Sequence, residues 1–215
     1  MLGAVFNPQA ELSITESCRP HWSQTGAIVF GTFRTDDSVP TQVLDLWERE
    51  KQDWLARRGY AGLHWSNALA QLNPQDRTEF NIEFNRRRED LLDTNRGKCL
   101  LKCPELSEIV ASALVHFDGE RYRMGDFIVM PNHVHLLCAF ADADAMREQF
   151  DSWQHYTAFQ INKRLGQKGK FWQGDPFDHL VRSPEQYEYL RDYVRDNPRK
   201  AGISKGQYHY RCYQG

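Results

Sequence analysis

The chain has 215 residues, of which 40% are hydrophobic and 26% are charged, and its formal net charge is −2. This length suits one ordinary domain over residues 1–215 with a sizeable core, and the near-neutral charge gives no sign that the whole chain binds nucleic acid. No apolar run approaches the roughly 20 residues that cross a bilayer, and the five scattered cysteines argue against a disulfide framework, so we expect a cytoplasmic protein without a membrane span.

The N-terminal half is predicted to contain a leader, a strand and two long helices. Residues 1–24 have no clear periodicity and are expected to form an irregular leader. The β-branched and aromatic run at 27–33 predicts a buried strand. Helices are expected to start at Pro40 and to run from Pro74 to Leu92. We interpret the stretch at about 40–95 as a helical insertion on the single domain.

The next predicted elements lead to a pair of histidines. A helix is expected from Pro104 to His116, and the turn at Asp118-Gly119 begins a hairpin whose second arm reaches Met130-Pro131-Asn132-His133-Val134-His135-Leu136-Leu137. Because side chains alternate along a strand, His133 and His135 would share one face. Two convergent imidazoles are half of a metal site, although a histidine pair at this spacing is often structural or incidental. The interpretation therefore depends on what else completes the site.

A long helix and a basic loop follow. Residues Ala143 to Leu165 are predicted to be helical, and the segment 162–172 combines cations with aromatic rings. These side chains are Lys163, Arg164, Lys168, Lys170, Phe171 and Trp172. Cations interleaved with aromatic rings suit phosphate contacts and base stacking on single-stranded DNA. The alternative is a solvated loop with both aromatic residues turned into the core.

The last predicted helix carries a tyrosine and an amide one turn apart. Ser183 and Pro184 are typical of a helix start, and Pro198 predicts that the helix ends near Asn197. Tyr193 and Asn197 are four residues apart, so they lie on one helix face and could reach the same metal. The alternative is that the tyrosines of this helix only form the buried stripe of an amphipathic helix.

Together these segments resemble a known family, the HUH single-strand DNA endonucleases, and within it the single-tyrosine transposases associated with repetitive extragenic palindromes. The resemblance rests on the strand 130–137, on motifs within 156–179, and on the helix and its exit at 193–202. Order and spacing agree over nearly the whole chain from about residue 26 to residue 202.

The resemblance implies a fold and a set of site residues. The implied fold is α+β, with the ferredoxin-like antiparallel sheet core of HUH endonucleases, a helical insertion and an extra C-terminal helix. His133, His135 and Asn197 would hold a divalent metal, Mg²⁺ or Mn²⁺, and Tyr193 would be the nucleophile. Many single-tyrosine relatives have Gln as the third ligand, so the shorter Asn197 is a departure from the family pattern.

The implied function is metal-dependent cleavage and rejoining of single-stranded DNA near palindromic hairpins through a 5′-phosphotyrosine intermediate. The expected partner is single-stranded or hairpin DNA, bound by a monomer, with a dimer as the alternative. The expected DNA contacts are Lys163, Arg164, Lys168, Lys170, Phe171, Trp172, Arg199 and Lys200.

Two other functions stay open from the sequence. The first is a domesticated protein that binds DNA or RNA hairpins without cleaving them. The second is a metal hydrolase in which the histidine pair and a carboxylate such as Asp126 or Asp178 activate water.

Overall fold

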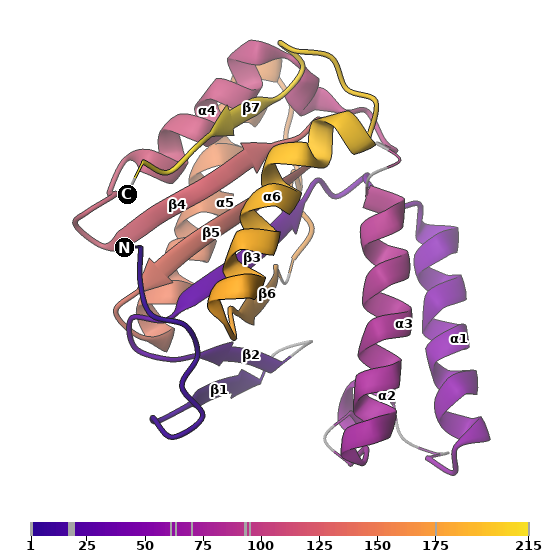
Figure 1. Cartoon of the computed structure of the whole chain (residues 1–215). Helices are drawn as coiled ribbons and strands as arrows, with labels where there is room; N and C mark the ends of the chain where they lie inside the picture. The colour runs from indigo at the N-terminus through magenta and orange to yellow at the C-terminus, as the bar shows by residue number, and fades with distance from the viewer. Residues whose placement is uncertain are drawn as a thin grey trace.

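A five-stranded antiparallel sheet lies at the centre of the structure (Figure 1). The strand order is β6-β3-β5-β4-β7. The strands are β3 (Ile28–Arg34), β4 (Tyr122–Val129), β5 (His133–Phe140), β6 (Phe177–Leu180) and β7 (His209–Arg211). This computed structural model describes residues 2–16, 20–60, 62, 64–69, 71–92, 94, 96–174 and 176–214.

Four of these strands and two helices form a ferredoxin-like core. Helix α4 (Pro104–Val115) lies between β3 and β4 in the chain, after the short 3-10 helix η1 (Leu100–Lys102), and α5 (Ala143–Leu165) lies between β5 and β6. The sequence order β-α-β-β-α-β combined with the spatial order β6-β3-β5-β4 defines this arrangement. The expected α+β class with a ferredoxin-like antiparallel core is therefore confirmed. Strand β7 extends the sheet beyond β4.

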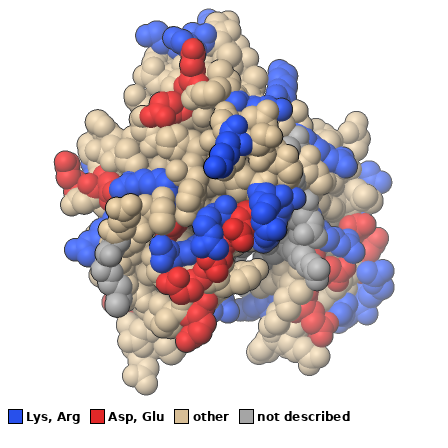
Figure 2. Space-filling model, turned by 45° about the horizontal axis from the view of Figure 1, so that its top comes forward, with Lys and Arg blue, Asp and Glu red and all other residues tan. Residues whose placement is uncertain are grey.

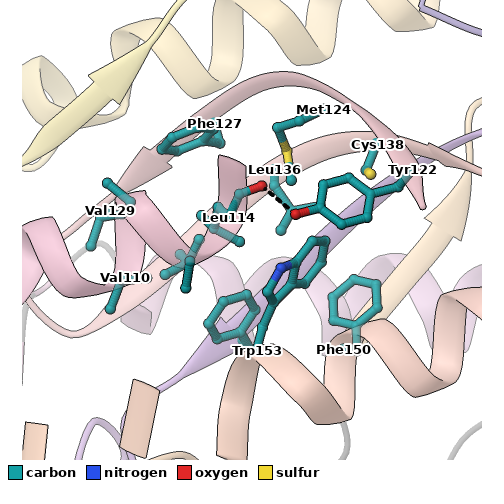
Figure 3. Close-up of a cluster of buried hydrophobic side chains, with 14 of the residues drawn as sticks. Val110, Leu114, Tyr122, Met124, Phe127, Val129, Leu136, Cys138, Phe150 and Trp153 are labelled. Carbon is teal, nitrogen blue, oxygen red and sulfur yellow. Dashed lines mark hydrogen bonds between the residues drawn. The ribbon is translucent and has the colours of Figure 1, made fainter. Parts of the chain in front are cut away.

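One face of the sheet packs against α4 and α5. Alternate residues of β5 point to this face. They are Val134, Leu136 and Cys138, and all three are fully buried in the largest hydrophobic cluster. Within that cluster the hydroxyl of Tyr122 donates a hydrogen bond of 2.9 Å to the carbonyl of Leu114 (Figure 3). The alternation that buries these residues turns the intervening positions of β5 to the opposite face.

Gly31 lets α5 approach the sheet closely. A Cβ atom at this position would lie 2.5 Å from the ring of Phe150, so any larger residue would displace that ring. The glycine in the middle of β3 therefore serves helix packing rather than a turn.

The other face of the sheet is covered by the C-terminal helix α6 (Pro184–Lys200). Leu190 and Val194 of this helix pack with Ile28, Phe30 and Leu137 of the sheet in a second buried cluster. The face that carries the even-numbered β3 residues and the odd-numbered β5 residues is thus the α6 face.

The leader is more ordered than the sequence predicts. Residues Ser13–Glu16 (β1) and Pro20–Ser23 (β2) form a two-stranded antiparallel sheet, and Leu2 is buried. The expected irregular leader at 1–24 is therefore corrected. Strands of four residues are too short to reveal alternation, and Pro20 stands at the first position of β2, where a proline is tolerated. Cys18 lies outside the described residues.

The stretch interpreted as an insertion forms helices that project from the sheet (Figure 1). They are α1 (Thr41–Arg57), α2 (Trp65–Ala68) and α3 (Pro74–Leu92). They share a hydrophobic cluster made of Trp54, Leu55, Trp65, Ala68, Leu72, Phe80 and Phe84. Among the residues that the structure describes, no buried member of this cluster comes from the sheet, so the insertion has a core of its own. In the described part of the chain, no helix is long and apolar enough to span a membrane.

Candidate metal and tyrosine site

His133 and His135 lie side by side on the face of the sheet that α6 covers. Their ring centroids are 4.6 Å apart, the ring planes are inclined by 71°, and both side chains are buried. In the register of the sheet His133 is opposite Arg34 and His135 is opposite Thr32. The prediction that the two imidazoles share one strand face is confirmed.

Asn132 fixes the orientation of the His133 ring. Its Nδ2 donates to the carbonyl of Arg96 over 2.9 Å, which leaves Oδ1 as the atom that faces His133 Nδ1 at 2.7 Å. Because an amide oxygen only accepts hydrogen bonds, His133 Nδ1 must carry the proton. The lone pair of a neutral His133 is therefore on Nε2, which is the form that binds metals.

The ring of His135 is held by a threonine hydroxyl, which can accept or donate a hydrogen bond. Thr32 Oγ1 lies 2.8 Å from His135 Nδ1, and Tyr193 Oη lies 3.5 Å from the other ring nitrogen, Nε2. When Nδ1 donates to the threonine hydroxyl, the Nε2 lone pair can accept the tyrosine proton or bind a metal. One lone pair cannot do both at once, so the two uses of His135 exclude each other.

The amphipathic pattern of α6 turns Tyr193 towards the histidines. The helix begins where the Ser183 hydroxyl accepts a hydrogen bond from the amide of Gln186, and its buried stripe runs from Leu190 to Pro198. The Tyr193 ring packs edge-on against His135, with 5.2 Å between ring centroids. Tyr189 is 65% exposed, so it projects into solvent although it is only one turn earlier.

Asn197 is completely buried one turn beyond Tyr193. Arg191 of α6 contacts Asp126, which lies between the β4 residues paired with Cys138 and Leu136, whereas Tyr193 contacts His135. In Figure 1, α6 runs towards the end of the sheet at which β5 begins. This direction carries Asn197 towards the His133 end of the histidine pair.

The helix continues past the predicted end. It runs to Lys200 with Pro198 in its last turn, so the predicted end near Asn197 is wrong by about one turn. The amide of Ala201 still bonds the carbonyl of Asn197 over 3.0 Å, and the amide of Ile203 bonds the carbonyl of Pro198 over 2.8 Å. These bonds after the proline stabilise the extra turn, which a local rule on the residue before proline does not foresee.

The donor atoms of this site fit a metal with mixed nitrogen and oxygen ligands. Among the residues that the structure describes, no group of three or more His, Cys, Asp or Glu side chains could hold a metal ion. A third protein ligand beside His133 and His135 would have to be of another type, and the buried amide of Asn197 is of that type. The roles of these three residues as ligands stay a prediction.

The two carboxylates of the hydrolase alternative do not join the histidines. Asp178 pairs in register with Gly31, which places it on the sheet face opposite the histidines. Asp126 accepts hydrogen bonds from Arg191 Nε at 2.8 Å and from the Tyr210 hydroxyl at 3.3 Å. The hydrogen bond to Asp126 raises the pKa of Arg191, so this guanidinium stays charged.

A third histidine, which is partly buried, shares the α6 face. His179 packs on Phe30 with 5.3 Å between ring centroids, and His135 stacks on the same Phe30 at 5.4 Å. Burial, with a smaller contribution from the charge of Arg182, lowers the pKa of His179 to about 4. His179 is therefore neutral at physiological pH and belongs to the packing around the site.

The predicted cationic DNA contacts are all exposed. They are Lys163, Arg164, Lys168, Lys170, Arg199 and Lys200. Three of them have acidic partners. Arg164 forms an ion pair with Glu105, Lys170 lies 3.0 Å from Asp36, and Arg199 lies 3.7 Å from Asp196. Lys200 Nζ lies 4.8 Å from the centroid of the Tyr193 ring. On the face in Figure 2, basic side chains are interspersed with acidic ones and form no uniform basic surface.

The two predicted aromatic contacts are corrected by the structure. Phe171 and Trp172 are each 4% exposed. Trp172 packs edge-on against Phe33, with 4.8 Å between centroids, and its Nε1 donates to Thr157 Oγ1 over 2.7 Å. A ring enclosed in the core cannot stack on a base, so the solvated-loop alternative holds for these two residues.

Sequence reasoning missed the residues that orient the site. Asn132 directly precedes the first histidine, and its position could have indicated a partner for that ring. Thr32 and Asp126 gave no local signal, because their roles depend on the register between strands and on the path of α6.

No family model matches the chain, and no curated protein matches it. Among solved structures, the chain is similar to a REP-associated tyrosine transposase bound to a REP hairpin. The two are 14% identical, the similarity covers 86% of this chain and 74% of that chain, and the TM-score is 0.44. That protein is of the class that the sequence motifs resemble.

Proposed function

We propose that this protein is a metal-dependent single-stranded DNA endonuclease and strand transferase that cuts near hairpins and uses Tyr193 as nucleophile. The observation that supports this most is the contact between the partly buried Tyr193 and the buried His135, at 3.5 Å from Oη to Nε2, next to the buried His133. A phenol beside two oriented imidazoles serves no evident packing need that a phenylalanine could not meet.

His133, His135 and Asn197 would hold the metal, Mg²⁺ or Mn²⁺. When bound, such a metal withdraws charge from a phosphate oxygen and aligns the phosphate for in-line attack. Asn132 and Thr32 keep the two imidazoles in a fixed orientation for this task. All three ligands are uncharged, so the negative charge in the site would come from the DNA phosphate itself.

The reaction conserves the energy of the phosphodiester. The Tyr193 oxygen would bond to the phosphorus as the bond to the 3′ oxygen breaks, and the 3′ oxygen takes up a proton while the phenol gives one up to solvent. The product is a 5′-phosphotyrosine and a free 3′ hydroxyl, which can attack the adduct to rejoin the strands. Lys200, whose ammonium lies over the Tyr193 ring, supplies positive charge where the phosphate would approach.

A cleavage assay tests this proposal. A single-stranded oligonucleotide with a hairpin, labelled downstream of the cut, is incubated with the protein and Mn²⁺, and the products are separated on a denaturing gel. The label should move with the protein, and both EDTA and Tyr193→Phe should abolish the adduct. Tyr189→Phe is the matched control, because Tyr189 is an exposed tyrosine of the same helix and should leave the adduct unchanged.

Two results would favour the alternatives. A cut with a free 5′ phosphate and no adduct would indicate a hydrolase that activates water. Tight hairpin binding without any cut, with and without metal, would indicate a binding protein that no longer cleaves.

A further inference from the structure

Helix α5 presents an exposed aromatic pair that the proposed chemistry does not use. Tyr156 is 53% exposed and Phe159 is 63% exposed, although large aromatic side chains are usually well buried. The two rings are three residues apart, and Lys163 follows four residues later, so all three lie along one side of the helix. The opposite side of α5 packs into the core through Trp153 and Ile161.

The chain after α5 connects this helix side to the end of the sheet that carries the histidines. The loop that starts at Gly166 returns to the sheet where the amide of Asp36 bonds the carbonyl of Phe171 over 2.8 Å. At the same end, the amide of Thr35 bonds the carbonyl of Asn132 over 2.8 Å, directly beside His133. A strand that leaves the histidine site could therefore pass around this end of the sheet to α5.

We propose that the exposed side of α5 around Tyr156 and Phe159 binds single-stranded DNA that flanks the cut. Bases would stack on the two rings, and Lys163 and the exposed Lys168 of the following loop would contact phosphates. This surface contains none of the catalytic residues, so its function is to hold the strand and not to cut it. The proposal goes beyond the cleavage reaction but takes the same ligand, DNA.

Charge favours DNA over a second copy of the chain as the occupant. The two rings lie next to cations, and single-strand binding surfaces combine these two kinds of side chain. A stable protein interface needs about 800 Å² on each partner. In the described part of α5 the large exposed hydrophobic residues are Tyr156, Phe159 and Leu165, which are too few for the centre of such an interface.

A binding measurement without cleavage tests the surface. Fluorescence anisotropy of a labelled oligothymidylate of about fifteen nucleotides, a length near the upper single-strand site size, is recorded in EDTA. Tyr156→Ala combined with Phe159→Ala should weaken binding roughly tenfold or more. Leu46→Ala combined with Ile82→Ala is the matched control, because these residues of α1 and α3 are 50% and 62% exposed, and it should bind as the unmodified protein does.

Two further variants separate stacking from charge and from apolar contact. Tyr156→Leu with Phe159→Leu keeps an apolar surface but removes the rings, and it should bind as weakly as the alanine pair. Lys163→Gln with Lys168→Gln should make the slope of log affinity against log salt concentration shallower, by roughly the amount that two phosphate contacts contribute. The alanine pair should leave that slope unchanged. Helix content from circular dichroism confirms that each variant is folded.

The outcomes distinguish this surface from the proposed reaction. If the alanine pair binds DNA with unchanged affinity, the proposed DNA-binding surface is wrong, whether or not Tyr193 forms an adduct. If the leucine pair binds DNA fully, the aromatic rings are not needed and the proposed surface is wrong. If the alanine pair shifts from dimer to monomer with unchanged DNA affinity, the patch is a protein contact and the proposal is also wrong. Normal binding by unmodified protein that forms no tyrosine adduct would leave the surface supported and contradict the proposed reaction.

Discussion

At the residue scale, the site is organised by hydrogen bonds that determine which imidazole nitrogen is available. Asn132 can present only its oxygen to His133, because its amide nitrogen is used by the carbonyl of Arg96. Thr32 positions the ring of His135 from the neighbouring strand, and its hydroxyl can either accept from or donate to Nδ1. The two histidines are therefore pre-oriented before any ligand binds, which lowers the cost of assembling a metal site.

Thr32→Val should test this orientation directly. Valine keeps the shape of threonine but leaves His135 Nδ1 without the hydroxyl, so Mn²⁺ affinity should fall by about 10- to 100-fold. Isothermal titration of the protein with Mn²⁺ measures the change. Thr157→Val is the control, because Thr157 is also a buried threonine but belongs to α5 on the other face of the sheet. Equal affinities for both variants would show that the hydroxyl does not orient the ligand.

His179 should make the protein less stable in mild acid. Its pKa is lowered to about 4 in the folded state, mainly by burial, whereas the ordinary value is 6.5. The unfolded chain therefore takes up a proton as the pH falls from about 6.5 towards 4, and the folded protein does not, so stability is lost across that window.

Replacing His179 with phenylalanine removes this proton uptake. Between pH 7 and pH 5 the loss of unfolding free energy should shrink by roughly 1–2 kcal/mol relative to the unmodified protein. Urea unfolding at the two pH values measures the difference. An identical loss in both proteins would mean that His179 is protonated in the folded state.

At the element scale, α6 is the part that brings the tyrosine to the strand. Its position depends on the ion pair between the partly buried Arg191 and the buried Asp126. The Asp126 carboxylate also accepts hydrogen bonds from the Tyr210 hydroxyl and from the amide of Tyr213. The C-terminal segment and the helix are thus joined at one carboxylate, which is 1% exposed.

Asp126→Asn should weaken the contact between α6 and the C-terminal segment. The change removes the buried carboxylate and leaves the exposed Glu188 as the acidic partner of Arg191, so it should cost about 2–4 kcal/mol of unfolding free energy. Adduct formation should also fall, because Tyr193 is on the same helix. Urea unfolding and the gel assay measure the two effects. Asp196→Asn breaks only exposed pairs with Arg195 and Arg199 and should cost less than about 1 kcal/mol. Equal stability of the two variants would contradict the role of the buried pair.

The elements that could be predicted from sequence are those with local signals. The bounds of α3 and α5 agree with the predicted Pro74–Leu92 and Ala143–Leu165, since a proline starts the first, and Asp142 and Gly166 cap the second. Strands β6 and β7 were not predicted, because four- and three-residue strands are defined by partners far away in the chain. Composition also does not show which side of a loop or helix faces the core. For this reason the sequence did not predict that Tyr156 is exposed and that Trp172 is buried.

At the scale of the whole molecule, the ferredoxin-like core and the helical insertion have separate hydrophobic clusters. The exit of the insertion still touches the site, because the Arg96 carbonyl accepts a hydrogen bond from Asn132 and the amide of Lys98 bonds Asp37. The insertion can therefore vary in its own core while its base remains fixed next to His133.

Phe80→Ala should test this division. Phe80 is 3% exposed and packs edge-on against Trp54, so its loss should destabilise the insertion by about 3–5 kcal/mol. Hydrogen exchange followed by mass spectrometry should show faster exchange within 41–92 and unchanged protection in β3, β4 and β5. Faster exchange throughout the sheet would show that the two clusters unfold together.

The central claim, that Tyr193 itself forms the bond to DNA, is tested most directly by mapping the adduct. After reaction with a hairpin oligonucleotide, nuclease and trypsin digestion leave the modified tyrosine on a short peptide for mass spectrometry. Trypsin cleaves after Arg182, Arg191 and Arg195, so it separates Tyr193 from Tyr187 and Tyr189. We predict a nucleotide attached to the peptide 192–195. A nucleotide on the peptide 183–191, or no modified tyrosine in a reaction that cuts the DNA, would contradict the account.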